Sequence, residues 1–262
     1  MVIEINYRKV PVVKKTENNN NVTVDYLAVE TVINLHYNDV KITSLLGSPC
    51  DVGYLILGHL IAEGYLEYDQ TMSIKNSVTT HSVNNGIEVY LRGDASLAIE
   101  SKSSGITSTS CGACNTDGLD DLIKTLPIIN SKINFCDSIL HPGLQLMKSQ
   151  QVGFSKTGGM HCAGLLSSNG LISCFAEDIG RHNAVDKVIG KSLDIAEHDA
   201  HILLLSGRCG WDIVAKASRA NIPVIASIGA CSTLAADCAR ALGIKIYSVS
   251  YTHLTLPTKC SV

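Results

Sequence analysis

Apolar and polar positions alternate along much of the first half of the chain, which is the period-two pattern of half-buried β-strands. Two triplets, Tyr37-Asn38-Asp39 and Asn84-Asn85-Gly86, favour turns that divide this half into two hairpins. The predicted strands are 26–36, 40–46, 71–83 and 87–92. Between the hairpins, apolar residues recur at helical spacing over 52–64, with Asp51 placed to cap the helix. A polar loop is predicted at 18–21.

The second half alternates short apolar runs with amphipathic segments. Two apolar runs, 163–166 and 171–175, flank the turn-forming Ser167-Ser168-Asn169-Gly170 and predict an antiparallel hairpin. The remaining predicted elements are strand 201–205, helix 211–220, strand 222–228, helix 233–242 and strand 244–249. Short apolar strands joined by helical crossovers pair in parallel within a sheet covered on both faces. We therefore expect an α/β fold with a mixed sheet and flanking helices.

A segment rich in Ser, Thr and Gly separates the two patterns. Such residues bury little apolar surface, so we expect a mobile loop over 101–118. The predicted organisation is a β-rich N-terminal part with one helix over 1–100, this loop, and an α/β cofactor-binding domain over 119–250. Residues 251–262 continue neither pattern, and we interpret them as a non-native tail.

Composition and charge limit the possible partners. The 262 residues are 45% hydrophobic, which is enough for a substantial core. A net charge of −3 argues against a general nucleic-acid or membrane-surface binder, although it permits a local basic pocket. The chain has no apolar run of transmembrane length and no N-terminal signal pattern. We expect a cytoplasmic protein without nucleic-acid or membrane partners.

Most of the ten cysteines stand singly in apolar stretches, as small buried hydrophobes do in a reducing compartment. The examples are Cys162, Cys174, Cys231 and Cys238. Only Cys111 and Cys114 are spaced for joint chemistry. A Cys-x-x-Cys pair can form half of a zinc site, a thioredoxin-like redox motif or a sulfur carrier.

The three meanings of the pair make different demands on the rest of the chain. A zinc site needs two more ligands, and His141, His161 or His182 could complete it. A thioredoxin-like motif should follow an apolar strand, but Ser, Thr and Gly precede Cys111. A sulfur carrier needs an exposed thiol on a pliable segment, which agrees with the predicted loop.

Two polar segments of the second half fall at the carboxyl ends of predicted strands, where ligands bind α/β sheets, and a glycine-rich segment precedes them in the chain. In Thr157-Gly158-Gly159-Met160-His161, the glycines favour a positive-φ turn, their amides could hold an anion, and the histidine offers a titratable ring. A plain tight turn remains the alternative. After the predicted strand 201–205, Ser206-Gly207-Arg208 supplies amides and a guanidinium at a helix start, and Ser227 lies near the end of the predicted strand 222–228.

The segment 177–187 is unusually rich in polar groups for a strand-to-helix junction. Arg181 can bind a phosphate or carboxylate through its fork of donors, and His182 and Asn183 can contact the edge of a heterocycle. A solvated helix face is the alternative. We favour a functional role, because neighbouring apolar residues gather the polar groups on one side of the helix and at its start.

Seven segments together resemble the formate dehydrogenase accessory sulfurtransferase family, FdhD. They are 29–31, 61–64, 107–114, 157–161, 177–187, 206–208 and 222–227. The resemblance implies a cytidine-deaminase-like α/β domain, commonly homodimeric, with a smaller β-rich N-terminal part. It also implies that a cysteine desulfurase donates sulfur, which passes to the molybdenum bis(molybdopterin guanine dinucleotide) cofactor before that cofactor enters formate dehydrogenase.

On this resemblance, Cys111 carries the sulfur as a persulfide and Cys114 assists its release. The guanine-nucleotide-bearing cofactor is anionic, and no metal is expected to be held directly by the protein. The predicted cofactor contacts are Thr157, Gly158, Gly159, His161, Arg181, His182, Asn183, Asp186, Ser206, Gly207, Arg208 and Ser227. The chain lacks the Gly-aromatic-x-Arg segment that usually ends the family, which puts its cofactor affinity in doubt.

Two other functions stay open. One is a chaperone that only holds the cofactor, for which Cys111 would be dispensable. The other is a zinc-dependent nucleoside deaminase, although its signatures are absent. Ser110 precedes Cys111 in place of the Pro of Pro-Cys-x-x-Cys, and Met160-His161-Cys162-Ala163 lacks the Glu of His-x-Glu.

Overall fold

The computed structural model describes residues 6–16, 19–94, 123–131, 133–195 and 201–248. Its strands are β1 (Tyr7–Thr16), β2 (Asn19–Ala28), β3 (Thr31–Tyr37), β4 (Val40–Gly47), β5 (Thr79–Val83), β6 (Gly86–Leu91), β7 (His161–Leu166), β8 (Ile172–Asp178), β9 (Ile202–Leu205), β10 (Val224–Ser227) and β11 (Lys245–Ser248). Its helices are α1 (Val52–Ala62), α2 (Tyr68–Ile74), α4 (Leu140–Ser149), α5 (Val152–Thr157), α6 (Arg181–Ser192), α7 (Trp211–Arg219) and α8 (Thr233–Leu242). None of the described helices is both long and apolar enough to span a membrane.

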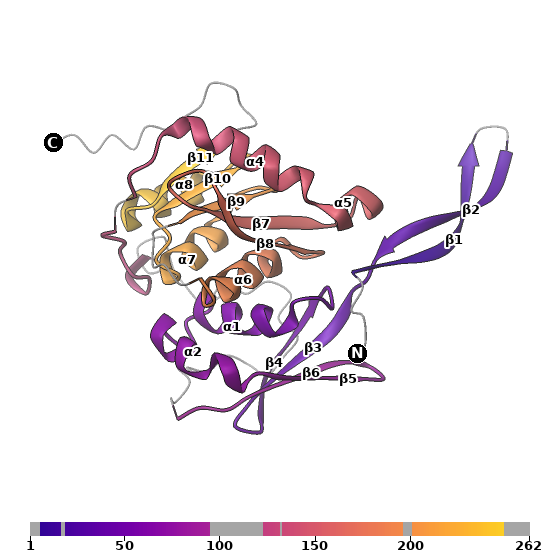
Figure 1. The fold of residues 1–262 in the computed structure, drawn as a ribbon, viewed down its shortest axis with the longest axis horizontal. Coiled ribbons are helices and arrows are strands. Elements are labelled where there is room, and N and C mark those ends of the chain that lie inside the picture. Colours follow the sequence, from indigo (N-terminus) through magenta and orange to yellow (C-terminus); the bar gives the residue numbers. More distant parts are fainter. Residues whose placement is uncertain (1–5, 17–18, 95–122, 132, 196–200, 249–262) are drawn as a thin grey trace.

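A five-stranded mixed sheet of order β11-β10-β9-β7-β8 forms the centre of the second half. Strands β9, β10 and β11 are parallel, while β7 runs antiparallel to both β9 and β8. Successive side chains of β9 point to opposite faces, so Leu203 and Leu205 join the larger core whereas Ile202 and Leu204 pack with α4. Figure 1 shows α4 on one side of this sheet and α6 and α7 on the other. The predicted α/β class, mixed sheet and flanking helices are confirmed.

A four-stranded sheet of order β4-β3-β6-β5 forms the N-terminal part, with α1 packed between it and α6 (Figure 1). The same core cluster contains Ile33 of β3, Leu60 of α1 and Val188 of α6, all fully buried. The change of sequence pattern between 1–100 and 119–250 therefore does not divide the hydrophobic core. The predicted loop 101–118 and the predicted tail 251–262 lie outside the described residues.

The largest departure from expectation is an antiparallel ribbon of β1 and β2 that extends away from the body of the protein (Figure 1). The predicted strand 26–36 is divided into β2 and β3, with Val29 and Glu30 between them. The predicted polar loop at 18–21 was wrong at 19–21, which begin β2. A ribbon that lies in solvent needs no apolar alternation, so the asparagines gave no strand signal.

Two local predictions were also wrong. The predicted strand 71–83 begins as a helix, because Glu67 and Gln70 form a capping box that starts α2. Asp51 precedes α1 as expected, but its backbone is left-handed at φ 59° and its side chain makes no capping hydrogen bond. Its carboxylate instead lies 2.7 Å from Lys191 Nζ of α6. Helices α4 and α5 were not predicted.

Candidate functional site

The carboxyl ends of β9 and β10 lie at the same edge of the sheet as the start of β7 and the end of β8. His161 at the start of β7 is paired with Asp178 at the end of β8, and Ser227 of β10 is paired with Leu205 of β9. The turn Ser206-Gly207-Arg208 leaves β9 at this edge, which we call the site edge. The structure thus brings together predicted residues from three distant segments.

Backbone and hydroxyl groups tie the turns of the site edge to one another. Ser206 Oγ accepts the N–H of Cys162 at 2.8 Å, which continues the pairing of β7 with β9. The N–H of Gly229 donates to Gly207 O at 3.0 Å, and a Cβ on Gly229 would lie only 2.8 Å from that oxygen. Ser227 is fully buried and donates to Gly229 O at 2.7 Å. Ser206 and Ser227 therefore shape the turns, and their contact with a ligand stays a prediction.

His161 is a half-buried imidazole among positive charges. Burial lowers its pKa first, the charges of Arg181 and Arg208 lower it further, and Asp178 opposes them. A Cβ on Gly207 would lie 3.4 Å from His161 Nδ1, so a glycine at this position lets the turn approach the ring closely. An anion that entered here would meet two guanidinium groups and an imidazole that gains a proton more easily once the anion is bound.

The start of α6 is connected to α7 through Asp212. His182 Nε2 hydrogen-bonds to Asp212 Oδ2, and the Arg181 guanidinium lies 3.5 Å from the same oxygen. Burial lowers the pKa of His182, whereas the Asp212 charge acts in the opposite direction. Sequence reasoning missed Asp212, although an acidic residue in the first turn of a helix after Gly210 was a usable signal.

Asn183 and Asp178 fasten the turn between β8 and α6 to the N-terminal part. Asn183 Nδ2 donates to Leu46 O at 2.7 Å and to Asp178 Oδ1 at 3.1 Å. Asp178 also accepts the N–H of Ser48 at 3.0 Å and lies 2.7 Å from Lys187 Nζ in a fully buried ion pair. Asn183 thus has a structural role whether or not it contacts a ligand.

Asp186 does not face the site edge, which corrects its predicted placement among the cofactor contacts. It is 1% exposed and lies in a buried cluster between α6, α1 and α7. Its Oδ1 is 2.7 Å from Lys216 Nζ, and its Oδ2 is 3.3 Å from His59 Nδ1. Lys216 also lies 2.7 Å from Glu63 Oε1. The helical position that buries Asp186 against α1 leaves it no surface for a ligand.

The glycines after α5 form the predicted turn but hold their amides differently. Gly158 ends the helix with φ 64°, in the left-handed region that favours glycine. Its N–H donates to Phe154 O at 2.7 Å, and the N–H of Gly159 donates to Thr157 Oγ1 at 3.1 Å. The expectation that these amides hold an anion is wrong for this conformation, because both are already bonded within the turn.

Cys111 and Cys114 lie outside the described residues, so their predicted roles stay predictions. Among the single cysteines, Cys162 and Cys238 are buried as expected, while Cys174 and Cys231 are partly buried. Burial raises the pKa of Cys162 to about 12 and that of Cys174 to about 11. Neither is therefore a reactive thiolate at neutral pH.

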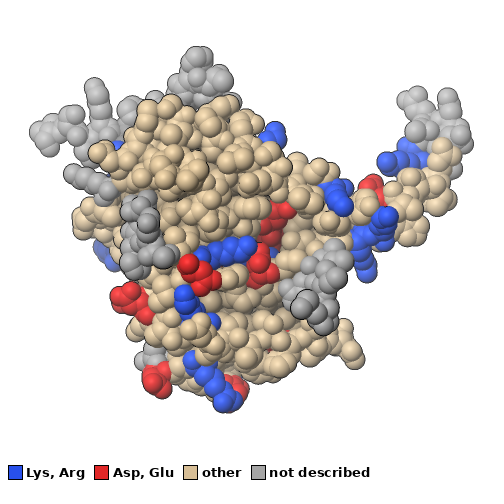
Figure 2. All heavy atoms as spheres, viewed as in Figure 1, with Lys and Arg blue, Asp and Glu red and all other residues tan. Residues whose placement is uncertain are grey.

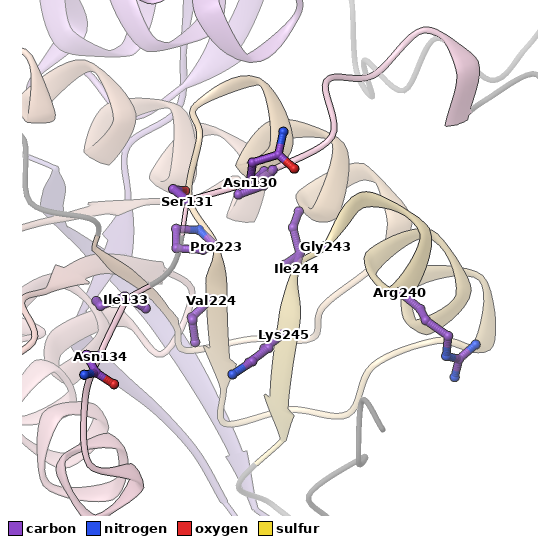
Figure 3. A pocket seen from close by; sticks show the side chains of 11 residues that line it. Asn130, Ser131, Ile133, Asn134, Pro223, Val224, Arg240, Gly243, Ile244 and Lys245 are labelled. Carbon is purple, nitrogen blue, oxygen red and sulfur yellow. The ribbon is translucent and has the colours of Figure 1, made fainter. Parts of the chain in front are cut away.

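A cavity of about 480 Å³ lies at the other end of the sheet, between residues 129–131 and 133–134 and the starts of β10 and β11 (Figure 3). Its two cations do not converge. Arg240 points away from Lys245 in Figure 3, and it lies 2.9 Å from Asp237 of its own helix. This cavity is separate from the site edge and lacks its convergent charges.

Charged side chains are not spread evenly over the molecule. Figure 2 shows acidic and basic groups interleaved between the layers of the two large sheets, where α1, α6 and α7 lie in Figure 1, while the face over α4 carries little charge. The fold and the site edge together define a mixed α/β protein with a polar, arginine-bearing site at the carboxyl ends of its central strands.

Comparison with known proteins identifies the family. The FdhD/NarQ family matches residues 28–252, and the chain belongs to this family. It is 31% identical over 241 residues to the sulfur carrier protein FdhD of Anaeromyxobacter sp. strain K, with 85% of this chain and 82% of that protein covered. It is 26% identical over 232 residues to the protein of the same name from Xanthomonas campestris pv. campestris strain B100, covering 87% and 82%.

The fold is shared with a solved structure. The crystal structure of a candidate formate dehydrogenase accessory protein from Desulfotalea psychrophila superposes with a TM-score of 0.74 over 93% of each chain, at 21% sequence identity. The resemblance stated from the sequence motifs is thereby confirmed at the level of family and fold.

Proposed function

We propose that this chain is a sulfur carrier that serves formate dehydrogenase. In this proposal a cysteine desulfurase is the donor, and the acceptor substrate is the molybdenum bis(molybdopterin guanine dinucleotide) cofactor. Membership of the FdhD/NarQ family and the name of the relatives support the sulfur-carrying role. The placement of His161, Arg181 and Arg208 at one edge of the sheet is the structural observation that carries the proposal, since together they provide a receptor for an anionic substrate.

The first chemical step is a thiolate exchange at sulfur. The Cys111 thiolate attacks the terminal sulfur of the donor persulfide, a new S–S bond forms on Cys111, and the donor cysteine leaves as a thiolate. In the second step, the Cys114 thiolate attacks the inner sulfur of the Cys111 persulfide. The terminal sulfur leaves as sulfide for the acceptor, and the two electrons it takes come from oxidation of Cys111 and Cys114 to a disulfide.

The described residues fit the anionic part of the acceptor. Arg208 is exposed, and the Arg181 side chain is 39% exposed, so both can reach a pyrophosphate with their fork of donors. Asp212 orients Arg181 and His182 from the neighbouring helix. In this proposal the arginines hold the substrate at the site edge, and His161 supplies a further donor once it is protonated.

Mass spectrometry of the thiols tests the proposal. After incubation with a cysteine desulfurase and cysteine, we expect Cys111 to gain the mass of one sulfur atom. Cys111→Ala should abolish this gain. Cys136→Ala removes an exposed cysteine in the second half and serves as the matched control, which should keep the gain on Cys111. An unmodified Cys111 beside other sulfurated thiols would contradict sulfur carriage.

Complementation separates a carrier from a cofactor-holding chaperone. In cells that lack the native gene, Cys111→Ala should give no active formate dehydrogenase if the thiol carries the sulfur. Retained dehydrogenase activity in that variant, at normal protein levels, would favour the chaperone.

A further inference from the structure

Two cysteines that are distant in the sequence lie opposite each other next to the site edge. Cys209 follows the turn that leaves β9, and Cys231 follows the turn that leaves β10. They are partners in a parallel β-bridge, in which the Cys209 N–H donates to Ala230 O at 3.1 Å and the Ser232 N–H donates to Cys209 O at 3.2 Å. The parallel pairing of β9 with β10 therefore resumes at these two residues, beyond the two turns.

The bridge gives the two cysteines the spacing that a disulfide requires. Neighbouring strands lie about 4.8 Å apart, and the α-carbons of a disulfide are usually about 4.4–6.8 Å apart. Bridge partners in a parallel pair also direct their side chains to the same face. Both cysteines accordingly pack in the same hydrophobic core, Cys209 as a buried member and Cys231 as a partly buried neighbour.

The turns that precede the two cysteines are already in close contact. The Gly229 N–H donates to Gly207 O at 3.0 Å, and a Cβ on Gly229 would lie 3.0 Å from the Arg208 nitrogen. A covalent link between Cys209 and Cys231 would thus join two segments that the folded chain already holds together.

The two thiols differ in their access to solvent. Cys209 is 1% exposed, whereas Cys231 is partly exposed. Burial raises the pKa of Cys209 first, and the charges of Cys231 and Asp212 raise it further. Cys231 is therefore the thiol that meets a dissolved reagent. Once Cys231 is bonded to an uncharged group it no longer carries a charge, so Cys209 ionises more easily.

We propose that Cys209 and Cys231 form a reversible disulfide, with a low-molecular-weight disulfide as the oxidant. The Cys231 thiolate attacks one sulfur of the small disulfide, a mixed S–S bond forms, and one small thiolate leaves. The Cys209 thiolate then attacks the Cys231 sulfur, the bond between the cysteines forms, and the second small thiolate leaves. Two protein thiols are oxidised, the small disulfide is reduced to two small thiols, and these thiols take up the two cysteine protons.

This dithiol is distinct from the Cys111 and Cys114 pair. Strand pairing brings Cys209 and Cys231 together, and Arg208 directly precedes Cys209. Oxidation therefore fastens the turn that carries an arginine of the site edge to the segment that leads into α8. The inference goes beyond sulfur carriage and does not depend on it.

Peptide mapping of the oxidised full chain tests the disulfide. The folded protein is incubated with hydroxyethyl disulfide, an uncharged reagent, and the reaction is stopped with acid. The remaining thiols are alkylated in denaturant, and the protein is digested with trypsin without reduction. We expect peptides 209–216 and 220–240 to be linked with the loss of two hydrogen atoms, and Cys238 to be alkylated. Reduction before alkylation should abolish the link.

Cys231→Ala and Cys238→Ala are matched variants, because both cysteines lie in the peptide 220–240. Cys231→Ala should lose the linked peptides completely. Cys238→Ala should keep them, since Cys238 is buried in α8 and lies outside the bridge. Far-UV circular dichroism verifies that both variants are folded.

Urea denaturation shows whether the link belongs to the native fold. Oxidised wild type should have a higher denaturation midpoint than reduced wild type, because the link constrains the unfolded chain. Cys238→Ala should keep this rise and Cys231→Ala should lose it.

Four results would overturn the proposal. They are Cys209 and Cys231 both recovered as alkylated thiols, a mixed disulfide on Cys231 that goes no further, a link that forms only in urea, and a linked protein without the rise in midpoint. No persulfide enters the experiment, so its outcome is independent of the proposed function.

Discussion

His161 takes its electrostatic character from groups that are far apart in the sequence. Arg181 begins α6 and Arg208 follows β9, yet both act on the same imidazole because three chain segments end at the site edge. Half-burial and positive charge keep this ring neutral to a lower pH than an ordinary histidine. The ring is thereby set to respond to an incoming anion.

Arg208→Ala should raise the pKa of His161, since it removes one of the two positive charges that disfavour the imidazolium. NMR titration of the imidazole nitrogens measures the change directly. Arg240→Ala is the control, because Arg240 is an exposed arginine by the cavity at the other end of the sheet, and it should leave the titration unchanged. A His161 titration equal in both variants would show that Arg208 is not a neighbour in solution.

Three helices meet through a buried cluster of charges. Lys216 of α7 is buried. Its Nζ lies 2.7 Å from Oε1 of Glu63, just beyond α1, and 2.7 Å from Oδ1 of Asp186 in α6. Burial by itself would raise the pKa of Asp186, but Lys216 and His59 hold it below the ordinary value. The cluster positions α6, whose first residues form part of the site edge. The charges in this cluster therefore matter for the site without facing it.

Lys216→Met should cost about 3–5 kcal/mol in the free energy of unfolding at neutral pH, because two buried carboxylates lose the same cationic partner. Lys245→Met, at an exposed lysine, should change it by less than about 0.5 kcal/mol. Urea denaturation with a circular dichroism readout gives both values.

The loss of stability in Lys216→Met should depend on pH. The folded pKa of Asp186 is lowered, so its contribution to stability is present above the unfolded value and is lost as the pH falls through the folded value. Protonation of Asp186 also removes the buried charge that Lys216→Met leaves without its lysine. The stability difference between this variant and the wild type should therefore shrink on acidification, and a constant difference would contradict the buried charge cluster.

The whole molecule shares one principal core across its two halves. Ile33, Leu60, Val188 and Leu203 come from the four-stranded sheet, α1, α6 and the five-stranded sheet, and all belong to the same buried cluster. The Asp178–Lys187 pair adds polar bonds to Ser48 across the same boundary. Such continuity predicts that the halves unfold together.

Leu60→Ala in the N-terminal part should lower the stability of both halves by about 2–5 kcal/mol. Trp211, the single tryptophan of the chain, reports on α7, while far-UV circular dichroism reports on the whole molecule. We expect coincident denaturation curves from the two probes, shifted equally by the substitution. If Leu60→Ala did not shift the denaturation midpoint reported by Trp211, the halves would unfold independently.

The second half could be predicted closely because its pattern is local. The strands near 202–205 and 224–227 are mostly apolar, and each is followed by a turn with Gly and an amphipathic helix, so their type and order could be predicted from the sequence. The ribbon of β1 and β2 could not be predicted in this way, since strands in solvent need no alternation of apolar and polar residues. Asp212 was also missed, because its importance depends on His182 of another helix.

Motif and periodicity were sufficient to indicate the family, the α/β class and the junctions at which Arg181 and Arg208 lie, because each motif and each period depends on residues close together in the sequence. Tertiary packing alone decided that Asp186 is enclosed by Lys216 and His59, that the amides of Gly158 and Gly159 are already bonded, and that β2 keeps an open edge. The physical reason is that burial and hydrogen-bond partners are set by segments that meet only in the folded chain.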